Sequence, residues 1–398
     1  MKKALATILA LVMAIGLCSV SWATGSTLPT AENGVIKLTE NVTLTERWEV
    51  AANTEITLDL NGYSITSAGQ VIMNNGKLTI TDNKGGGKIV STGSQAIGVG
   101  SNSVTNIQKA IVESVEGAVI TGRAIGAIIN IYDGTFSASD NAVIAGNGSD
   151  REGTGNTINI SGGVFNGKIT TPGYVACGIY APWKDNINVT GGTFNITGGA
   201  GIVARAGNVT VTNAVFNTTG NATGKVGDSR VVVPCSAIVF DSQANYPAMN
   251  NDSVIHVVSG KFNSEMNAVS MIKNDNETDR VAVTGGTFST DVKEYLAEGK
   301  ILQKNGDTYT AVTNSGITSG TYTAKPTVPD GYKVVENTDG TFTVEKVGGY
   351  YYYQPTTDTK TDNTKGSPKT FDAGIALYVG MALTSAAGVA FVGKKRED

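Results

Sequence analysis

The chain has 398 residues, of which only 16% are charged and 7% aromatic, while glycine alone contributes 50. Its hydrophobic share of 40% excludes wholesale disorder, and a net charge of −4 without long Lys/Arg runs excludes a basic nucleic-acid-binding surface. The single histidine, His256, excludes multi-histidine metal sites and permits at most one Ser/His/Asp constellation, so the composition leans against catalysis.

The N-terminus has the three-part pattern of a secretory signal. Two lysines precede an apolar stretch over residues 4–17, and small residues within 21–23 occupy the positions that a signal peptidase reads. We therefore expect residues 1–23 to be absent from the mature protein. A lipoprotein signal using Cys18 is the alternative, but that signal needs a small residue before the cysteine, where Leu17 stands.

The interior of the chain is a repeat, which is sought before single motifs. A unit of apolar, polar and apolar residues, a turn and a phenylalanine recurs six times, ending at Phe136, Phe165, Phe194, Phe216, Phe262 and Phe288. A second signature of a small and an aliphatic residue falls once in each interval, so the long interval between Phe216 and Phe262 is one repeat with two insertions. Looser copies lie at 56–62 and 78–83, and one further turn of undetermined register lies within 102–123.

This pattern predicts a parallel β-solenoid over residues 33–290, with about nine coils. Strict alternation indicates strands, since successive side chains point to opposite faces, and stacking buries like residues in columns. Paired glycines before phenylalanine fit corners that need positive φ or close backbone approach; they lie at 162–163, 191–192 and 285–286. The asparagines that follow phenylalanine are expected to form a ladder of amides; they are Asn166, Asn195, Asn217 and Asn263.

The motifs Thr-Leu-Asp-Leu-Asn-Gly at 57–62 and Asn-Ile-Ser-Gly-Gly-x-Phe at 159–165 resemble those of right-handed parallel β-helix proteins of the pectate-lyase-like class. The similarity is to repeat-rich surface proteins of Gram-positive bacteria rather than to the enzymes, and it covers about residues 33–312. For the fold, the resemblance implies an all-β, right-handed parallel β-helix. For activity it implies little, because one fold hosts many functions.

Beyond the last phenylalanine the pattern changes. Residues 291–346 are expected to form a cap and a small β appendage, with a short helix over 291–300 and turn-plus-strand units at 305–312 and 337–346. The Thr/Asp/Lys-rich stretch that follows, within 347–366, is predicted to be an extended spacer.

The segment 367–398 has the order of a surface anchor. Residues 373–392 carry no charge and at about 1.5 Å per residue are long enough to span a bilayer core of about 30 Å. The basic cluster at 394–396 favours an N-outside orientation. We therefore expect an exported protein held at the bacterial cell surface through this segment; a buried core helix is the alternative.

The pentapeptide Ser367-Pro368-Lys369-Thr370-Phe371 stands before this segment. The arrangement resembles the sorting signals of Gram-positive wall proteins, in which a sortase cleaves between Thr and Gly of Leu-Pro-x-Thr-Gly and joins the Thr to peptidoglycan. Pro368, Lys369 and Thr370 match that pattern. Ser367 replaces Leu, and Phe371 replaces the Gly at the cleaved bond, so membrane anchoring is the firmer prediction and attachment to peptidoglycan the weaker.

The outward face of the repeated strand is where the resemblance implies that enzymes of this class use Asp or Glu. Two outward columns contain one carboxylate, Asp59, and no Arg or Lys; they comprise Thr57, Thr79, Asn130, Asn159, Asn188, Thr210, His256 and Ala282, and Asp59, Thr81, Tyr132, Ser161, Thr190, Thr212, Val258 and Thr284. A catalytic pair needs carboxyl groups about 5–9.5 Å apart. These columns therefore predict a solvated β surface, with His256 as an ordinary strand histidine.

Two further features bear on metal binding and on disulfide formation. Residues 274–279 offer oxygens at alternate positions and suit calcium, but they lack the Gly and distal Glu of a known loop, so a solvated turn is preferred. Cys177 and Cys235 are placed two coils apart, about 9.6 Å, too far for a disulfide. We therefore expect two free, buried thiols, and neither a metal nor a cofactor.

Insertions suggest one binding site. The short connection carrying Arg205 lies between longer ones carrying Tyr180 and Trp183 on one side and Tyr246 on the other. This arrangement suggests the hypothesis of a notch with exposed aromatic rings suited to stacking on sugars; the preferred interpretation is that Trp183 and Tyr246 cover the cores of loops.

The sequence thus favours a non-enzymatic adhesion or glycan-binding rod displayed on a bacterial envelope, whose partners are a glycan or another surface ligand, the cell membrane and, more weakly, peptidoglycan. A polysaccharide lyase or glycoside hydrolase on the same scaffold is the alternative. A purely structural envelope protein is the third hypothesis.

Overall fold

The computed structural model describes residues 27–348, except 123, 140, 147–154, 228–231, 243–252 and 274–279. The predicted signal peptide, the sorting-like motif and the membrane segment therefore lie outside the described residues, as does the spacer apart from its first two residues. Within the described ranges, no helix has the length and hydropathy that crossing a bilayer requires.

Short alternating segments form the strands, as the sequence predicts. In Thr157–Ile160, for example, Ile158 and Ile160 are both fully buried, while Asn159 between them faces outward. Each turn of the chain supplies three such strands. In the described residues the chain makes nine turns with a strand in each of three sheets, followed by β30 and β31, so the fold is all-β, a parallel β-solenoid.

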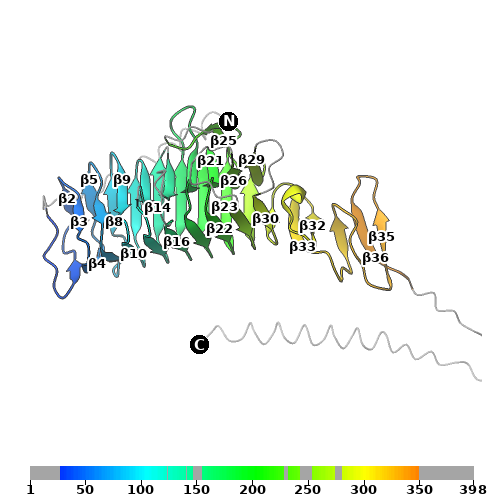
Figure 1. The fold of residues 1–398 in the computed structure, drawn as a ribbon, viewed down its shortest axis with the longest axis horizontal. Coiled ribbons are helices and arrows are strands. Elements are labelled where there is room, and N and C mark those ends of the chain that lie inside the picture. The colour runs from blue at the N-terminus through cyan, green and yellow to red at the C-terminus, as the bar shows by residue number, and fades with distance from the viewer. Residues whose placement is uncertain are drawn as a thin grey trace, which may run out of the picture. The chain divides into compact units, whose positions relative to one another are not determined.

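The three sheets run along the solenoid with parallel pairing between consecutive turns (Figure 1). The first sheet contains β1 (Val35–Lys37), β4 (Glu55–Asp59), β7 (Lys77–Thr81), β10 (Val104–Ile107), β13 (Ile128–Ile131), β16 (Thr157–Ile160), β19 (Asn186–Val189), β22 (Asn208–Val211), β27 (Val254–Val257) and β30 (Val281–Val283). The second contains β2 (Val42–Leu44), β5 (Ile65–Ser67), β8 (Lys88–Ser91), β11 (Ile111–Ser114), β14 (Thr135–Ser139), β17 (Val164–Lys168), β20 (Thr193–Thr197), β23 (Ala214–Thr219), β28 (Gly260–Ser264) and β31 (Thr287–Phe288). The third contains β3 (Trp48–Val50), β6 (Ile72–Asn74), β9 (Gln95–Val99), β12 (Gly117–Ile120), β15 (Ala142–Ala145), β18 (Ala176–Ala181), β21 (Gly199–Ala204), β26 (Ile238–Asp241) and β29 (Val269–Ile272).

The predicted repeat boundaries agree with the pairing. The stretch whose register the sequence left open supplies β10, β11 and β12, which form turn 4. Across the long interval, β22 pairs directly with β27 and β23 with β28, so that interval is one turn with insertions. One insertion contains the antiparallel hairpin of β24 (Thr223–Lys225) and β25 (Val232–Pro234).

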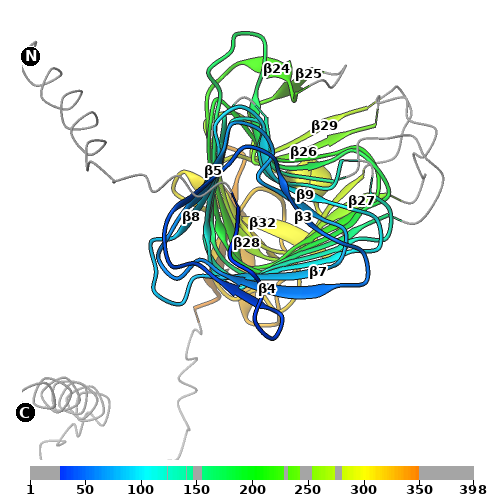
Figure 2. The same ribbon diagram turned by 90° about the vertical axis from the view of Figure 1, so that its left-hand side faces the viewer.

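The core lies inside the three sheets, which surround it in the view of Figure 2. In turns 5 to 10 the second sheet contributes a column of phenylalanines with parallel rings, whose centroids are 5.0, 4.4, 4.5, 5.6 and 4.9 Å apart from Phe136 to Phe288. The same column is aliphatic in turns 1 to 4; its members are Val42, Ile65, Ile89 and Val112. Stacking therefore places like residues above like, the arrangement that the sequence predicts.

The paired glycines serve both of the purposes proposed for them. A Cβ on Gly191 would overlap the carbonyl oxygen of Ser161 in the preceding turn, so this position needs a close backbone approach. Gly192 has φ of +99°, which an L-residue rarely adopts, and its Cβ would lie 3.2 Å from the ring of Phe165. The corner before the phenylalanine is thus made by the two glycines together.

After β31 the second sheet continues with antiparallel strands. The 3₁₀ segment η1 (Lys293–Tyr295) is shorter than the helix predicted for residues 291–300. The strands that follow are β32 (Lys300–Asn305), β33 (Thr308–Thr313), β34 (Gly320–Tyr322), β35 (Tyr332–Glu336) and β36 (Phe342–Lys346), with β33 paired to β31.

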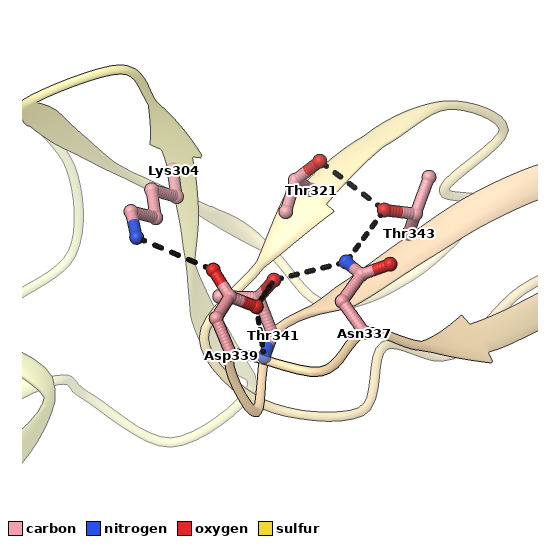
Figure 3. A network of polar contacts seen from close by, with 6 residues as sticks. All are labelled: Lys304, Thr321, Asn337, Asp339, Thr341 and Thr343. Carbon is pink, nitrogen blue, oxygen red and sulfur yellow. Dashed lines mark hydrogen bonds and ion pairs between the residues drawn. The ribbon is translucent and has the colours of Figure 1, made fainter.

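A polar network connects these last strands (Figure 3). Asn337 donates from Nδ2 to the hydroxyls of Thr341 and Thr343, at 2.9 Å each. The Thr341 hydroxyl donates to Asp339, whose carboxylate also lies 3.7 Å from Lys304 Nζ. The Thr341 hydrogen bonds, followed by the charge of Lys304, hold the pKa of Asp339 below its usual value.

Candidate functional site

The first sheet presents a polar outer face with few charges. Its register confirms the predicted outward column and adds Asn106 to it, between Thr79 and Asn130. The amides form a ladder in which Asn130 donates to Asn106, Asn159 to Asn130 and Asn188 to Asn159, at 2.8, 2.8 and 2.9 Å. His256 continues the column as an exposed residue of β27.

Asp59, predicted at a solvated outward position, is instead 5% exposed. Burial alone raises the pKa of its carboxyl. Hydrogen bonds from Asn83 (side chain 3.0 Å, backbone 3.2 Å) and Asn61 (2.9 Å) and the charge of Lys37 outweigh that effect, so the pKa lies below its ordinary value of 3.8. The only carboxylate of the two predicted columns is therefore occupied in holding turns 2 and 3 together.

The second sheet carries the other predicted ladder of amides. Asn195 donates to Asn166, Asn217 to Asn195 and Asn263 to Asn217, at 3.2, 2.9 and 2.8 Å. Each internal member uses one donor and one acceptor of its amide in the ladder. An Asn side chain offers two donors and two lone pairs, so each keeps hydrogen-bonding capacity toward solvent.

Two grooves lie along this face of the second sheet. One has a volume of about 510 Å³, and its lining includes Glu113, Ser137, Asn166, Lys168, Asn195 and Thr197. The other has a volume of about 270 Å³, and its lining includes Asn217, Thr219, Asn263, Glu265 and Ser289. The linings come from successive turns, 4 to 7 and then 8 to 10, so the two grooves follow one another along the solenoid.

Most lining residues occupy two repeat positions, one and three residues after the phenylalanine. We call the residues at these positions in turns 5 to 9 the second-sheet strip; they are Ser137, Ser139, Asn166, Lys168, Asn195, Thr197, Asn217, Thr219, Asn263 and Glu265. The sequence indicated the Asn ladder but not the groove, because the catalytic residues of the resembled enzymes are expected on the first strand of each repeat. The polar residue three positions after the phenylalanine was the available signal.

Charges around the strip are few. Glu113 at one end of the larger groove forms an ion pair with Lys88 at 2.9 Å. Lys168 is exposed, and Glu265 accepts a hydrogen bond from the backbone N–H of Gly220 at 2.7 Å. The formal charges of these four side chains cancel.

The third sheet is covered on its outer face in turns 5 to 8. A second apolar cluster packs there, joining the sheet to the insertion that carries β24 and β25; it comprises Ala142, Ala145, Val175, Cys177, Ala200, Val203, Val226, Val233, Cys235 and Val239. The two thiols are free and buried, as predicted. Burial raises the pKa of Cys177 to about 12 and also raises that of Cys235. This face is therefore part of the interior rather than a surface.

The structure does not place exposed side chains of Trp183 and Arg205 at the notch suggested by the sequence. The prediction that Trp183 is an exposed ring is wrong, since its exposed fraction is 0%, and Arg205 is also buried at 1%. Arg205 follows β21 and lies beside Asp241 of the next turn, with Nε 3.0 Å from Oδ2, and its guanidinium lies 5.4 Å from the ring centre of Tyr180. Asp241 of the next turn and the ring of Tyr180 therefore lie against Arg205, and the burial of Trp183 favours the interpretation that it covers a loop core.

Two predicted positions lie outside the described residues, namely Tyr246 and the calcium candidate at 274–279. The predicted ligand binding stays a prediction for all four residues of the notch, Tyr180, Trp183, Arg205 and Tyr246. The indole of Trp183 is buried and does not support it. Among the residues whose placement is described, no group of three or more His, Cys, Asp or Glu side chains is arranged to hold a metal ion.

Comparison of the chain with family models, curated proteins and solved structures finds no match.

Proposed function

We propose that this protein is a non-enzymatic, glycan-binding rod displayed on a bacterial surface, and that the second-sheet strip is its binding surface. The observation that carries the proposal is the larger groove, whose lining offers amides and hydroxyls, followed along the solenoid by a second groove whose accessible lining is mostly apolar. Hydroxyl-rich ligands are recognised through hydrogen bonds of this kind, and a stack of rigid turns holds the donors and acceptors at fixed spacing.

The charges of the strip support binding rather than hydrolysis. The linings of the two grooves contain two carboxylates, Glu113 of turn 4 and Glu265 of turn 9. Five strand spacings of about 4.8 Å separate those turns by about 24 Å. Glycoside hydrolysis needs two carboxyl groups about 5–9.5 Å apart, so these two do not form such a pair.

The proposal includes the finer features that the sequence favours. We propose a right-handed path for the solenoid, export through residues 1–23, and anchoring by the apolar segment 373–392, with Ser367–Phe371 as a variant sorting motif. Each turn would then be presented outside the cell, where the strip meets glycans.

The experiment is a glycan array probed with the full-length purified protein, combined with an assay for reducing and unsaturated ends on the same glycans. We expect retention of glycans without new ends, with and without calcium. New chain ends would instead support the lyase or hydrolase alternative. Absence of both binding and turnover would favour a structural envelope protein and would overturn the proposal.

A further inference from the structure

On the basis of the proposed function, we infer that the second-sheet strip binds an extended, uncharged glycan chain that lies parallel to the solenoid axis and meets successive turns with successive sugars. The direction follows from the grooves. Their linings take equivalent positions from consecutive turns, and Asn195 of the larger groove is hydrogen-bonded to Asn217 of the smaller one. A ligand running along this line meets a new turn about every 4.8 Å.

The hydrogen-bonding capacity of the strip suits hydroxyl groups. Asn195 and Asn217 each donate once and accept once within the ladder. Each therefore keeps one N–H and one lone pair for a ligand. A sugar hydroxyl both donates and accepts, so it can satisfy both groups at one turn, and a chain of sugars repeats that match from turn to turn.

The charge balance selects an uncharged chain. Glu113 is paired with Lys88, and the remaining charges, Lys168 and Glu265, are of opposite sign. The described lining of both grooves contains no aromatic side chain. Ring stacking and ionic attraction therefore contribute little, affinity grows with the number of sugars in contact, and binding depends only weakly on salt.

The first sheet provides an internal control, because it has an amide ladder of the same kind but lines neither groove. Asn188 and Asn195 both belong to turn 7, and each donates to the asparagine of turn 6. Replacing either one by alanine interrupts a ladder in the same turn. Only the Asn195 variant also removes groups from a groove.

The test is calorimetric titration of the full-length protein with neutral linear gluco-, xylo-, manno- and galacto-oligosaccharides of increasing length. We expect affinity for at least one series to rise with chain length and to change little with added NaCl. Asn195→Ala is expected to weaken binding about tenfold, the loss of roughly one to two hydrogen bonds. Asn188→Ala is expected to change the affinity less than twofold.

A second variant keeps the test decisive if an interrupted ladder prevents folding. Thr197→Trp fills the larger groove from an exposed position without altering any ladder asparagine, and it is expected to abolish binding. Thr190→Trp, an exposed position of the same turn beside the first sheet, is the matched control and is expected to bind normally.

Three results overturn the inference. If Asn195→Ala and Asn188→Ala lose affinity equally, or if Thr197→Trp loses none, the ligand binds outside the strip. The protein would still be a glycan-binding protein in that case. Tighter binding of acidic than of neutral chains, with strong salt dependence, contradicts the charge argument. Failure of the unaltered protein to bind any neutral series overturns the inference, and binding to other glycans on the array then decides whether the proposed function survives.

Discussion

Turns 1 to 4 and turns 5 to 10 share one backbone register but hold their turns together differently. In the later turns, the second sheet stacks phenylalanine rings inside and lines up asparagine amides outside. In the earlier turns the inner column is aliphatic. Buried carboxylates join neighbouring turns in both regions: Asp82 accepts from the backbone of Gly62 at 2.7 Å, and Asp185 accepts from the backbone of Asn156 at 2.8 Å. The same parallel backbone pairing therefore accommodates an aliphatic or an aromatic column, provided that neighbouring turns carry similar side chains at that position.

The largest difference in stability between variants of the later and the earlier turns is expected for the inner column of the second sheet. Phe194→Ala should lower the free energy of unfolding by about 3–5 kcal/mol, because the ring lies between two others at 4.4 and 4.5 Å. Ile89→Ala in the same column should cost less, because no stacked rings are lost. Urea denaturation followed by circular dichroism measures both, and equal losses would contradict the special contribution of the rings.

Alanine substitutions at glycines compare the corners of the later and the earlier turns. Gly192→Ala should destabilise by about 1–3 kcal/mol, since alanine would be forced to φ near +99° beside a phenylalanine ring. Gly69→Ala, in an early turn with open space around the position, should be neutral or stabilise by up to about 1 kcal/mol. Thermal unfolding of the two variants gives the comparison, and a tolerated Gly192→Ala would show that the corner can relax.

A smaller effect is expected on the outer face of the first sheet. Asn159→Ala removes two ladder hydrogen bonds and should cost about 1 kcal/mol, because the amides are partly solvated. Thr57→Ala, in the same column but outside the ladder, should change stability by less than about 0.5 kcal/mol. Denaturation midpoints separate these outcomes, and indistinguishable midpoints would mean that the ladder contributes nothing to stability.

The smallest effect concerns pH and the early turns. The folded pKa of Asp59 lies below 3.8, so its carboxylate stabilises the fold above that pH, and this contribution is lost as the pH falls through the folded pKa. Asp59→Asn should therefore be less stable than the unaltered protein near neutrality and should approach it below about pH 3.8. Unfolding measured across acid pH tests this, and a constant difference would show that ionisation of Asp59 is not the cause.

The spacing of the repeat predicts the parallel solenoid, its columns and every turn boundary except those of the turn within 102–123. Alternation is a local property, and stacking requires each turn to place equivalent residues above those of its neighbour, so the phenylalanines, the glycine pairs and the asparagine ladder could all be predicted from spacing. The free thiols followed from the same register.

Which faces of the solenoid are accessible depends on contacts that form only on folding. The sequence left Trp183 and Arg205 either in an exposed notch or against a loop core; in the structure Arg205 lies beside Asp241 of the next turn and both side chains are buried. The groove likewise depends on how side chains of turns far apart in the chain shape one surface. Burial and concavity are set by partners brought together through folding, and a short repeat pattern carries no information about those partners.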